Sequence, residues 1–156
     1  MLNREMIYDA PQERFFEDVR LERFADIMKK NFEENTGRSA NIEYDSWKVT
    51  GDKIRNIIED AKLSGVYVSF EYQVPYTQER IDCMIFGKNS NNKGIIVHIE
   101  MKQWSKVEAL DIEGNFVETY VGKANRRRPH PSQQVEGYHS YLVGFVEVFE
   151  ENFFEL

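Results

Sequence analysis

Hydrophobic residues recur at helical spacing in two segments near the start of the chain. In residues 11–32 and again in residues 41–63 they fall three or four positions apart, which is typical of one buried face of a helix. Gly37 follows the first segment and Ser64-Gly65 follows the second, and such residues commonly end helices. The apolar positions are Leu21, Phe24, Ala25, Met28 and Phe32, then Trp47, Ile54, Ile57, Ile58 and Ala61.

The pattern then changes to alternation of apolar and polar residues, which is the period of a β-strand. Residues 66–72, 80–86 and 95–101 show it in succession. Residues 89–94, rich in Asn, Lys and Gly, separate the last two segments. These features predict three sequential strands, the last two paired as a hairpin.

The remaining pattern predicts a smaller hairpin and a long helix. Residues 107–112 and 116–121 flank Gly114, and residues 132–149 again place apolar side chains at helical spacing. The chain has 156 residues and contains no Pro-, Gly- or Ser-rich linker, so we expect one domain over residues 1–156. The order of elements predicts an α/β or α+β fold with two N-terminal helices, a central sheet, a small extra β-hairpin and a long C-terminal helix.

Composition excludes several classes of protein. Hydrophobic residues make up 41% of the chain and aromatic residues 13%, which excludes an intrinsically disordered or low-complexity chain. The sequence contains neither an apolar run of the ~18–20 residues that a membrane helix needs nor an N-terminal signal pattern, so we expect no membrane partner. Cys83 is the single cysteine, which favours a reducing, cytoplasmic setting.

The distribution of charge matters more than its sum. The formal net charge is −7, which argues against a wholly basic nucleic-acid coat. A basic segment nevertheless contains Lys123, Arg126, Arg127 and Arg128 with no acidic residue between them. Such a segment can hold phosphate locally on an acidic chain, or it can be a solvated loop, and the sequence leaves both interpretations open.

Polar side chains on two of the predicted strands suggest a site. Side chains two positions apart share a face of a strand, so Glu100 and Lys102 should lie together with His98. If the last two large strands pair, Asp82 can lie close to Glu100. Carboxylate oxygens in this arrangement suit a hard divalent cation, whereas the alternative is a charged strand face with cross-strand ion pairs. The opposite face of the strand would carry Val97, Ile99 and Met101.

A family resemblance enters at these residues. Asp82 followed by Glu100-Met101-Lys102 resembles the PD-(D/E)XK nuclease signature, and Gln134 to Tyr138 resembles the Q-x-x-x-Y motif of its RecB-type branch. More closely, the chain resembles the N-terminal nuclease-like domain of the Schlafen group 3-like DNA/RNA helicase family. The segments that carry this likeness are residues 71–75, 80–82, 99–104 and 130–134.

The chain departs from the family pattern in two places. Ile81 stands where a proline usually precedes the family aspartate. The G-x-x-x-x-G-K-[ST] loop of the helicase motor does not occur in the sequence, so this chain alone should not hydrolyse ATP.

The resemblance implies a fold and a set of roles. The fold would be a restriction-endonuclease-like αβββα core. Asp82, Glu100 and the backbone carbonyl of Met101 would hold Mg²⁺ or Mn²⁺, and Lys102 would orient the attacking water and touch the phosphate. Gln134 and Tyr138 would fix the nucleic-acid backbone or that water.

RecB-type domains often add a glutamate from an earlier helix, and two candidates exist here. Glu43 precedes Trp47 by one helical turn, which places it on the inward face of its helix. Glu59 aligns with Arg55 and Asp52 in a polar stripe that should face solvent. Glu43 is therefore favoured as a metal ligand, and Glu59 stays open.

Three functions are compatible with the sequence. The first is a metal-dependent nuclease-like domain that hydrolyses DNA or RNA. The second is the same fold as a catalytically silent nucleic-acid-binding module of a helicase, and the third is a protein-interaction domain.

The C-terminal part of the sequence predicts a missing strand. The fold that the chain resembles closes with a strand after this helix, and too few residues follow the helix to form it, so we expect the chain to be a fragment of a longer protein. The resemblance implies that a helicase region follows in that protein. The resulting open sheet edge and apolar patch would favour a homodimer. The aromatic residues of this patch would be Phe145, Phe149, Phe153 and Phe154.

Overall fold

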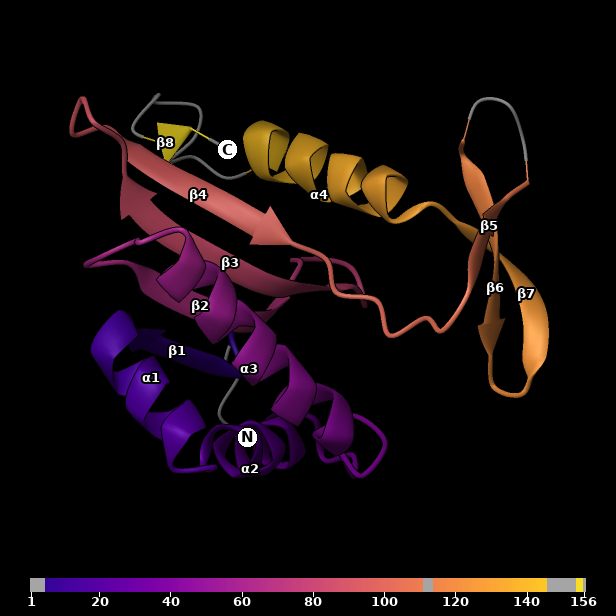
Figure 1. The fold of residues 1–156 in the computed structure, drawn as a ribbon, viewed down its shortest axis with the longest axis horizontal. Coiled ribbons are helices and arrows are strands. Elements are labelled where there is room, and N and C mark those ends of the chain that lie inside the picture. Colours follow the sequence, from indigo (N-terminus) through magenta and orange to yellow (C-terminus); the bar gives the residue numbers. More distant parts are fainter. Residues whose placement is uncertain (1–4, 111–113, 146–153, 156) are drawn as a thin grey trace. The chain divides into compact units, whose positions relative to one another are not determined.

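The computed structural model describes residues 5–110, 114–145 and 154–155, which form a mixed α+β fold (Figure 1). The chain divides into two compact units. The first comprises Met1–Ile99 with Phe154–Leu156, and the second comprises Glu100–Phe153. The α+β class predicted from the sequence is confirmed at this level.

The first unit is built on a five-stranded sheet of order β1-β2-β3-β4-β8. The three predicted central strands are all present and pair antiparallel in sequence order. The sequence pattern missed the two outer strands, because four residues and two residues are too few to show a period. The strands are β1 Tyr8–Pro11, β2 Tyr67–Gln73, β3 Arg80–Lys88, β4 Gly94–Ile99 and β8 Phe154–Glu155.

The strand β8 corrects the expectation of a missing strand. Phe154 and Glu155 pair in parallel with Gly94 and Ile95, so residues near the C-terminus do extend the sheet beside the start of β4. The aromatic patch was expected to form there from Phe145, Phe149, Phe153 and Phe154. The side chains of these residues lie outside the described part of the structure, which gives only the backbone of Phe145 and Phe154.

The described part of the first unit contains the helices α1 Gln12–Arg20, α2 Phe24–Thr36 and α3 Tyr44–Asp60 (Figure 1). Helix α1 packs against β1 and β2 and α2 packs against β1, whereas α3 packs mainly on α1 and α2. The single helix expected over residues 11–32 is therefore wrong, because the chain turns between α1 and α2. Glu22 takes a left-handed backbone conformation there, with φ of 56°. Gly37, with φ of 69°, ends α2 as predicted.

The turn between α1 and α2 is organised by the buried carboxylate of Asp18. Arg23 donates from Nη2 to Oδ1 of this carboxylate at 2.9 Å, and from its backbone nitrogen to the backbone carbonyl of Asp18 at 2.8 Å. The hydroxyl of Tyr8 donates to Oδ2 at 2.9 Å. These bonds keep a buried charge paired, which a continuous helix would not do.

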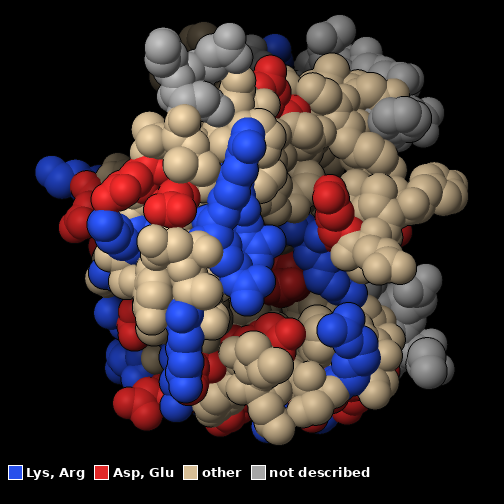
Figure 2. All heavy atoms as spheres, turned by 90° about the vertical axis from the view of Figure 1, so that its right-hand side faces the viewer, with Lys and Arg blue, Asp and Glu red and all other residues tan. Residues whose placement is uncertain are grey.

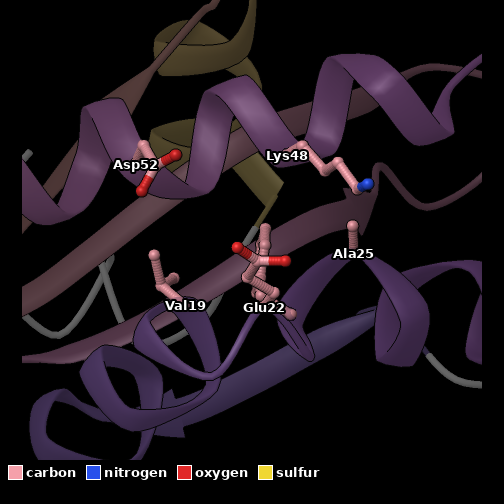
Figure 3. Close-up of a pocket in the computed structure, with 6 residues that line it drawn as sticks. Val19, Glu22, Ala25, Lys48 and Asp52 are labelled. Atoms are coloured by element: carbon pink, nitrogen blue, oxygen red, sulfur yellow. The ribbon is translucent and has the colours of Figure 1, made fainter.

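The core of the first unit is a cluster of aromatic rings. The ring of Phe24 lies 4.8 Å from that of Phe70 and 4.9 Å from that of Tyr8, centroid to centroid. Gly51 of α3 packs against the same ring, because a Cβ at this position would lie 2.7 Å from Cδ1 of Phe24. Gly51 is thus a point of close packing between α3 and the aromatic core. The α1–α2 turn and α3 also flank a cavity of about 200 Å³ into which Glu22, Lys48 and Asp52 project (Figure 3).

The second unit contains a three-stranded antiparallel sheet and one helix. The strands are β5 Val107–Ala109, β6 Phe116–Val121 and β7 Ala124–Pro129, and the helix is α4 Pro131–Phe145. The expected two-stranded hairpin is therefore corrected to three strands, and Arg126 to Arg128 lie on a strand and not in a loop. No helix in the described part of either unit is long and apolar enough to cross a membrane.

Candidate active site

Two acidic and two basic residues line a cleft of about 480 Å³ in the first unit. Glu43 directly precedes α3 and Glu71 lies in β2, while Arg38 follows α2 and Arg80 begins β3. Four elements therefore converge on one cleft. The rest of its wall is formed by Phe32, Thr36, Gln73, Thr77 and Gln78.

Glu71 interrupts the regular geometry of β2. Its φ is 54°, a left-handed conformation that a non-glycine residue rarely adopts within a strand. Such strain costs about 1–3 kcal/mol and is often found at functional sites. The residue is fixed at both ends, because Trp47 Nε1 donates to its Oε1 at 3.0 Å and Arg80 Nη1 donates to its backbone carbonyl at 2.9 Å.

The charges of two further carboxylates act on Glu71. Burial raises the pKa of Glu71, and the negative charges of Asp82 and Glu43 raise it further. The hydrogen bond from Trp47 and the charge of Arg80 act in the opposite direction. The cleft thus combines like charges with partial burial, an arrangement that favours uptake of a proton or a cation.

The sequence reasoning missed Glu71. The residue is the first of the segment 71–75 that carries the family resemblance, and it lies on the polar face of an alternating strand. Its strained backbone and its bond to Trp47 have no signature in the sequence, because the two residues meet only when α3 packs against β2.

The structure separates the two upstream glutamates. The Oε2 atom of Glu43 is buried and has no hydrogen-bond partner among the described residues. Glu59 is exposed and its Oε2 lies 3.9 Å from Nε of Arg55, which also lies near Asp52. Glu43 therefore belongs to the cleft, whereas Glu59 belongs to the solvent-facing polar stripe that the sequence predicted.

The second unit holds the other predicted residues as two pairs. Glu100 and Lys102 form an ion pair, in which the carboxylate side chain is 3% exposed and the ammonium side chain 26% exposed. Gln134 Nε2 donates to the hydroxyl of Tyr138 at 2.9 Å across one turn of α4, as their spacing predicts. Tyr138 is buried.

The expected faces of β4 need correction. Ile96 is buried and Val97 is half exposed, so Val97 does not lie on a buried apolar face. Where the described helices of the first unit contact the sheet, they contact mainly β1 and β2. They therefore do not cover the face of β4 that carries Val97. The strand also ends at Ile99, so Glu100, Met101 and Lys102 follow the strand and are not part of it.

The basic residues lie exposed on β7 and the turn before it. Lys123 occupies that turn with φ of 66°, and the guanidinium carbon of Arg127 lies 4.0 Å from the ring centroid of Phe116. Arg126 and Arg128 pair with Thr119 and Val117 and so share the opposite face of the strand. Figure 2 shows Lys and Arg side chains interspersed with Asp and Glu on the face that it draws.

The predicted metal ligands are of the chemical type that a hard cation prefers, but they do not form one site within the described part of the structure. Carboxylate oxygens, including the buried Oε2 of Glu43, are the ligands that Mg²⁺ and Mn²⁺ prefer. Within the described ranges, however, no three His, Cys, Asp or Glu side chains lie close enough together to hold a metal ion. Asp82 belongs to the first unit, whereas Glu100 and Met101 belong to the second.

Comparison with known proteins found no match. No family model, curated protein or solved structure matches this chain. What the chain does is therefore inferred from its own residues.

Proposed function

We propose that the chain is a metal-dependent nuclease-like domain that hydrolyses phosphodiester bonds of DNA or RNA. The observation that carries the proposal is that Glu43 and Glu71 line one cleft, at the strained backbone of Glu71, and that the charge of Asp82 also acts on Glu71. Like charges in a partly buried place are unfavourable unless something positive joins them. For carboxylate oxygens the natural partner is Mg²⁺ or Mn²⁺.

The strand register supports a role for Glu100 in the same site. Cys83 of β3 pairs with Ile99, the last residue of β4. Asp82 directly precedes Cys83 in the sequence, and Glu100 directly follows Ile99. We propose that Asp82, Glu43, Glu100 and the backbone carbonyl of Met101 would hold the ion. A bound divalent cation would activate a water molecule and offset charge on the phosphate.

The other residues have roles that follow from their partners. Lys102 is held by Glu100, so its ammonium would be placed beside the phosphate without being free to swing away. Gln134 and Tyr138 hold each other by a hydrogen bond, which leaves the amide oxygen of Gln134 as an acceptor for the attacking water.

The finer fold belongs to the same proposal. Three antiparallel strands in sequence order, β2, β3 and β4, follow α3 and precede α4. We infer a restriction-endonuclease-like αβββα core from this order. A helicase region in the same protein remains a prediction of the family resemblance, and a cytoplasmic location remains a prediction from the single cysteine. The homodimer also remains a prediction, but the missing strand on which it was based is filled by β8.

The first experiment is titration of the full chain with Mn²⁺ by isothermal calorimetry. The second is incubation with single- and double-stranded DNA and RNA in Mg²⁺ or Mn²⁺. We expect Mn²⁺ binding and cleavage, with binding weakened in Asp82→Asn and cleavage lost in Glu100→Ala. Glu59→Gln is the matched control, because it removes a glutamate charge outside the cleft and should change neither result.

Other outcomes would identify the alternatives. Nucleic-acid binding without cleavage by any metal would indicate a catalytically silent binding module. Absence of both metal binding and nucleic-acid binding would indicate a protein-interaction domain and would contradict the proposal.

A further inference from the structure

Tyr76 is an exposed aromatic residue that lies next in the sequence to residues of the cleft. Its side chain is fully exposed, and its φ of 61° is a left-handed conformation that costs energy for a bulky residue. It directly precedes Thr77 and Gln78, which both line the cleft. Neither packing nor an easy turn conformation accounts for a tyrosine at this position.

The turn that carries Tyr76 is held by a network of hydrogen bonds. Thr77 Oγ1 donates to the carbonyl of the buried Val74 at 3.0 Å, and the nitrogen of Val74 donates to the carbonyl of Glu79 at 3.0 Å. Gln73 Nε2 donates to the carbonyl of Thr77 at 2.8 Å. The backbone on both sides of Tyr76 is therefore fixed, and its ring is presented to solvent from an ordered turn.

Two guanidinium groups lie in the same cleft. Arg80 is oriented by its bond to the carbonyl of Glu71 and by the ring of Phe32, whose centroid lies 5.8 Å away. Arg38 and Arg80 both line this cleft. Burial lowers the pKa of Arg80, the charge of Glu71 raises it, and the like charge of Arg38 lowers it. Arg38 is exposed, and its backbone nitrogen donates to Thr36 Oγ1 at 3.2 Å.

This combination matches the parts of a nucleotide. Paired guanidinium groups recognise phosphate through several parallel hydrogen bonds. An exposed aromatic ring is the usual platform for an unstacked base of a single strand. Thr77, Gln73 and Gln78 supply neutral donors and acceptors between the two.

We propose that this cleft binds one nucleotide of single-stranded DNA or RNA, with a phosphate against Arg38 and Arg80 and the adjoining base stacked on Tyr76. The inference rests on the proposed nuclease-like function and names its substrate as single-stranded. Glu43 and Glu71 face the same cleft and repel phosphate, so the phosphate lies on the arginine side. A duplex keeps its bases stacked inside and cannot offer one to Tyr76.

The test measures binding of fluorescein-labelled dT12 and rU12 to the full chain by anisotropy, in EDTA so that cleavage does not interfere. We expect Tyr76→Ala to weaken binding roughly 5- to 150-fold for at least one of the two probes, the range for loss of one stacked base. Tyr76→Phe keeps the ring and should bind like the original chain. Arg38→Gln should flatten the salt dependence by about 0.7 in log–log slope.

Lys53→Gln is the matched control for Arg38→Gln, because it removes one exposed positive charge from α3 away from the cleft. Circular dichroism of each variant checks that the fold is kept, and Arg38 and Tyr76 are exposed enough for the fold to survive their replacement. Equal binding by Tyr76→Ala and Tyr76→Phe to both probes would overturn the inference. So would failure to bind either single strand, or tighter binding of a 12-base-pair duplex.

The inference and the proposed function can fail separately. If Glu100→Ala abolishes cleavage while the Tyr76 and Arg38 variants bind and cleave like the original chain, the nuclease stands and this cleft is not its substrate site. If the single strands bind through Tyr76 and Arg38 but no metal supports cleavage, the nucleotide-binding inference is confirmed and the nuclease proposal is wrong.

Discussion

The indole nitrogen of Trp47 donates a hydrogen bond of 3.0 Å to Oε1 of Glu71, and so links α3 to the strained residue of β2. Trp47 is buried, so its ring cannot follow the carboxylate if Glu71 moves. The bond stabilises the charged form of Glu71 against the effect of burial. The relationship explains how a carboxylate stays in place beside two others.

Trp47→Phe tests this bond. We expect the pKa of Glu71 to rise above its value in the original chain, because the one neutral group that lowers it is gone. The free energy of unfolding should fall by about 2 kcal/mol through the lost hydrogen bond and the smaller ring. Carboxyl ¹³C chemical shifts give the pKa and urea unfolding gives the stability. An unchanged pKa of Glu71 would show that the bond does not hold the carboxylate.

Glu71→Gln tests the pH dependence of the cleft. A carboxyl group whose pKa is raised on folding stabilises the protein below its unfolded pKa, and this contribution is lost as pH rises through the folded pKa. Gln keeps an acceptor for Trp47 and carries no charge. Its stability relative to the original chain should therefore increase as pH rises from about 4, near the unfolded pKa, towards 7.

Urea unfolding over this pH range measures the effect, and Glu59→Gln is the control at an exposed position paired with Arg55. A constant difference between Glu71→Gln and the original chain across the range would contradict the raised pKa.

The sequence predicted those features that repeat along the chain. The three central strands, the helix that contains Trp47 and the last helix all show a clear period, and the bond between Gln134 and Tyr138 follows from their spacing. The break between α1 and α2 was not predictable from periodicity, because the apolar stripe continues through it while Asp18 and Arg23 pair across it.

The candidate site was predicted in part for the same reason. Asp82, Glu100 and Lys102 were found because their order along the chain resembles a known motif. Glu71 and Arg38 reach the cleft only through tertiary packing, and the extra strand β7 contains three consecutive arginines that no alternating pattern marks as a strand. Sequence periodicity predicts single helices and strands, whereas the cleft forms where several of them pack together.

Gly51→Ala tests the close packing of α3. Alanine favours a helix over glycine by about 1 kcal/mol, but its Cβ would lie 2.7 Å from Cδ1 of Phe24 in a filled aromatic core. Overpacking of this kind costs typically 1–3 kcal/mol, so we expect a net loss of about 1 kcal/mol in the free energy of unfolding. Gly137→Ala in α4 is the control, since its Cβ would meet nothing within 4 Å. That variant should gain about 1 kcal/mol, and an equal gain at Gly51 would contradict the packing argument.

Asp18→Ala tests the turn between α1 and α2. The substitution leaves the hydroxyl of Tyr8 and the guanidinium of Arg23 without their acceptor, one of them buried. Loss of a buried paired carboxylate costs about 3–5 kcal/mol, and partial exposure of Arg23 places the expected loss near the lower end. Urea unfolding measures it. Asp26→Ala removes an exposed acid from the neighbouring helix and should cost far less, so comparable losses would contradict the role given to Asp18.

The arginines of β7 allow phosphate binding and side-chain packing to be tested separately on one strand. Arg126 and Arg128 share a face and are exposed, whereas Arg127 lies over the ring of Phe116 at 4.0 Å. If the first two contact phosphate, replacing both by Gln should lower the log–log salt slope of duplex DNA binding by about 1.8, or 0.9 per contact. Arg127→Gln should leave that slope unchanged and instead remove a cation–π contact worth about 0.5–1 kcal/mol at an exposed site. Anisotropy measured between 50 and 200 mM salt, a window in which phosphate contacts dominate, distinguishes the two cases. An unchanged slope in the double variant would assign this strand to solvent and leave any phosphate contact to the rest of the chain.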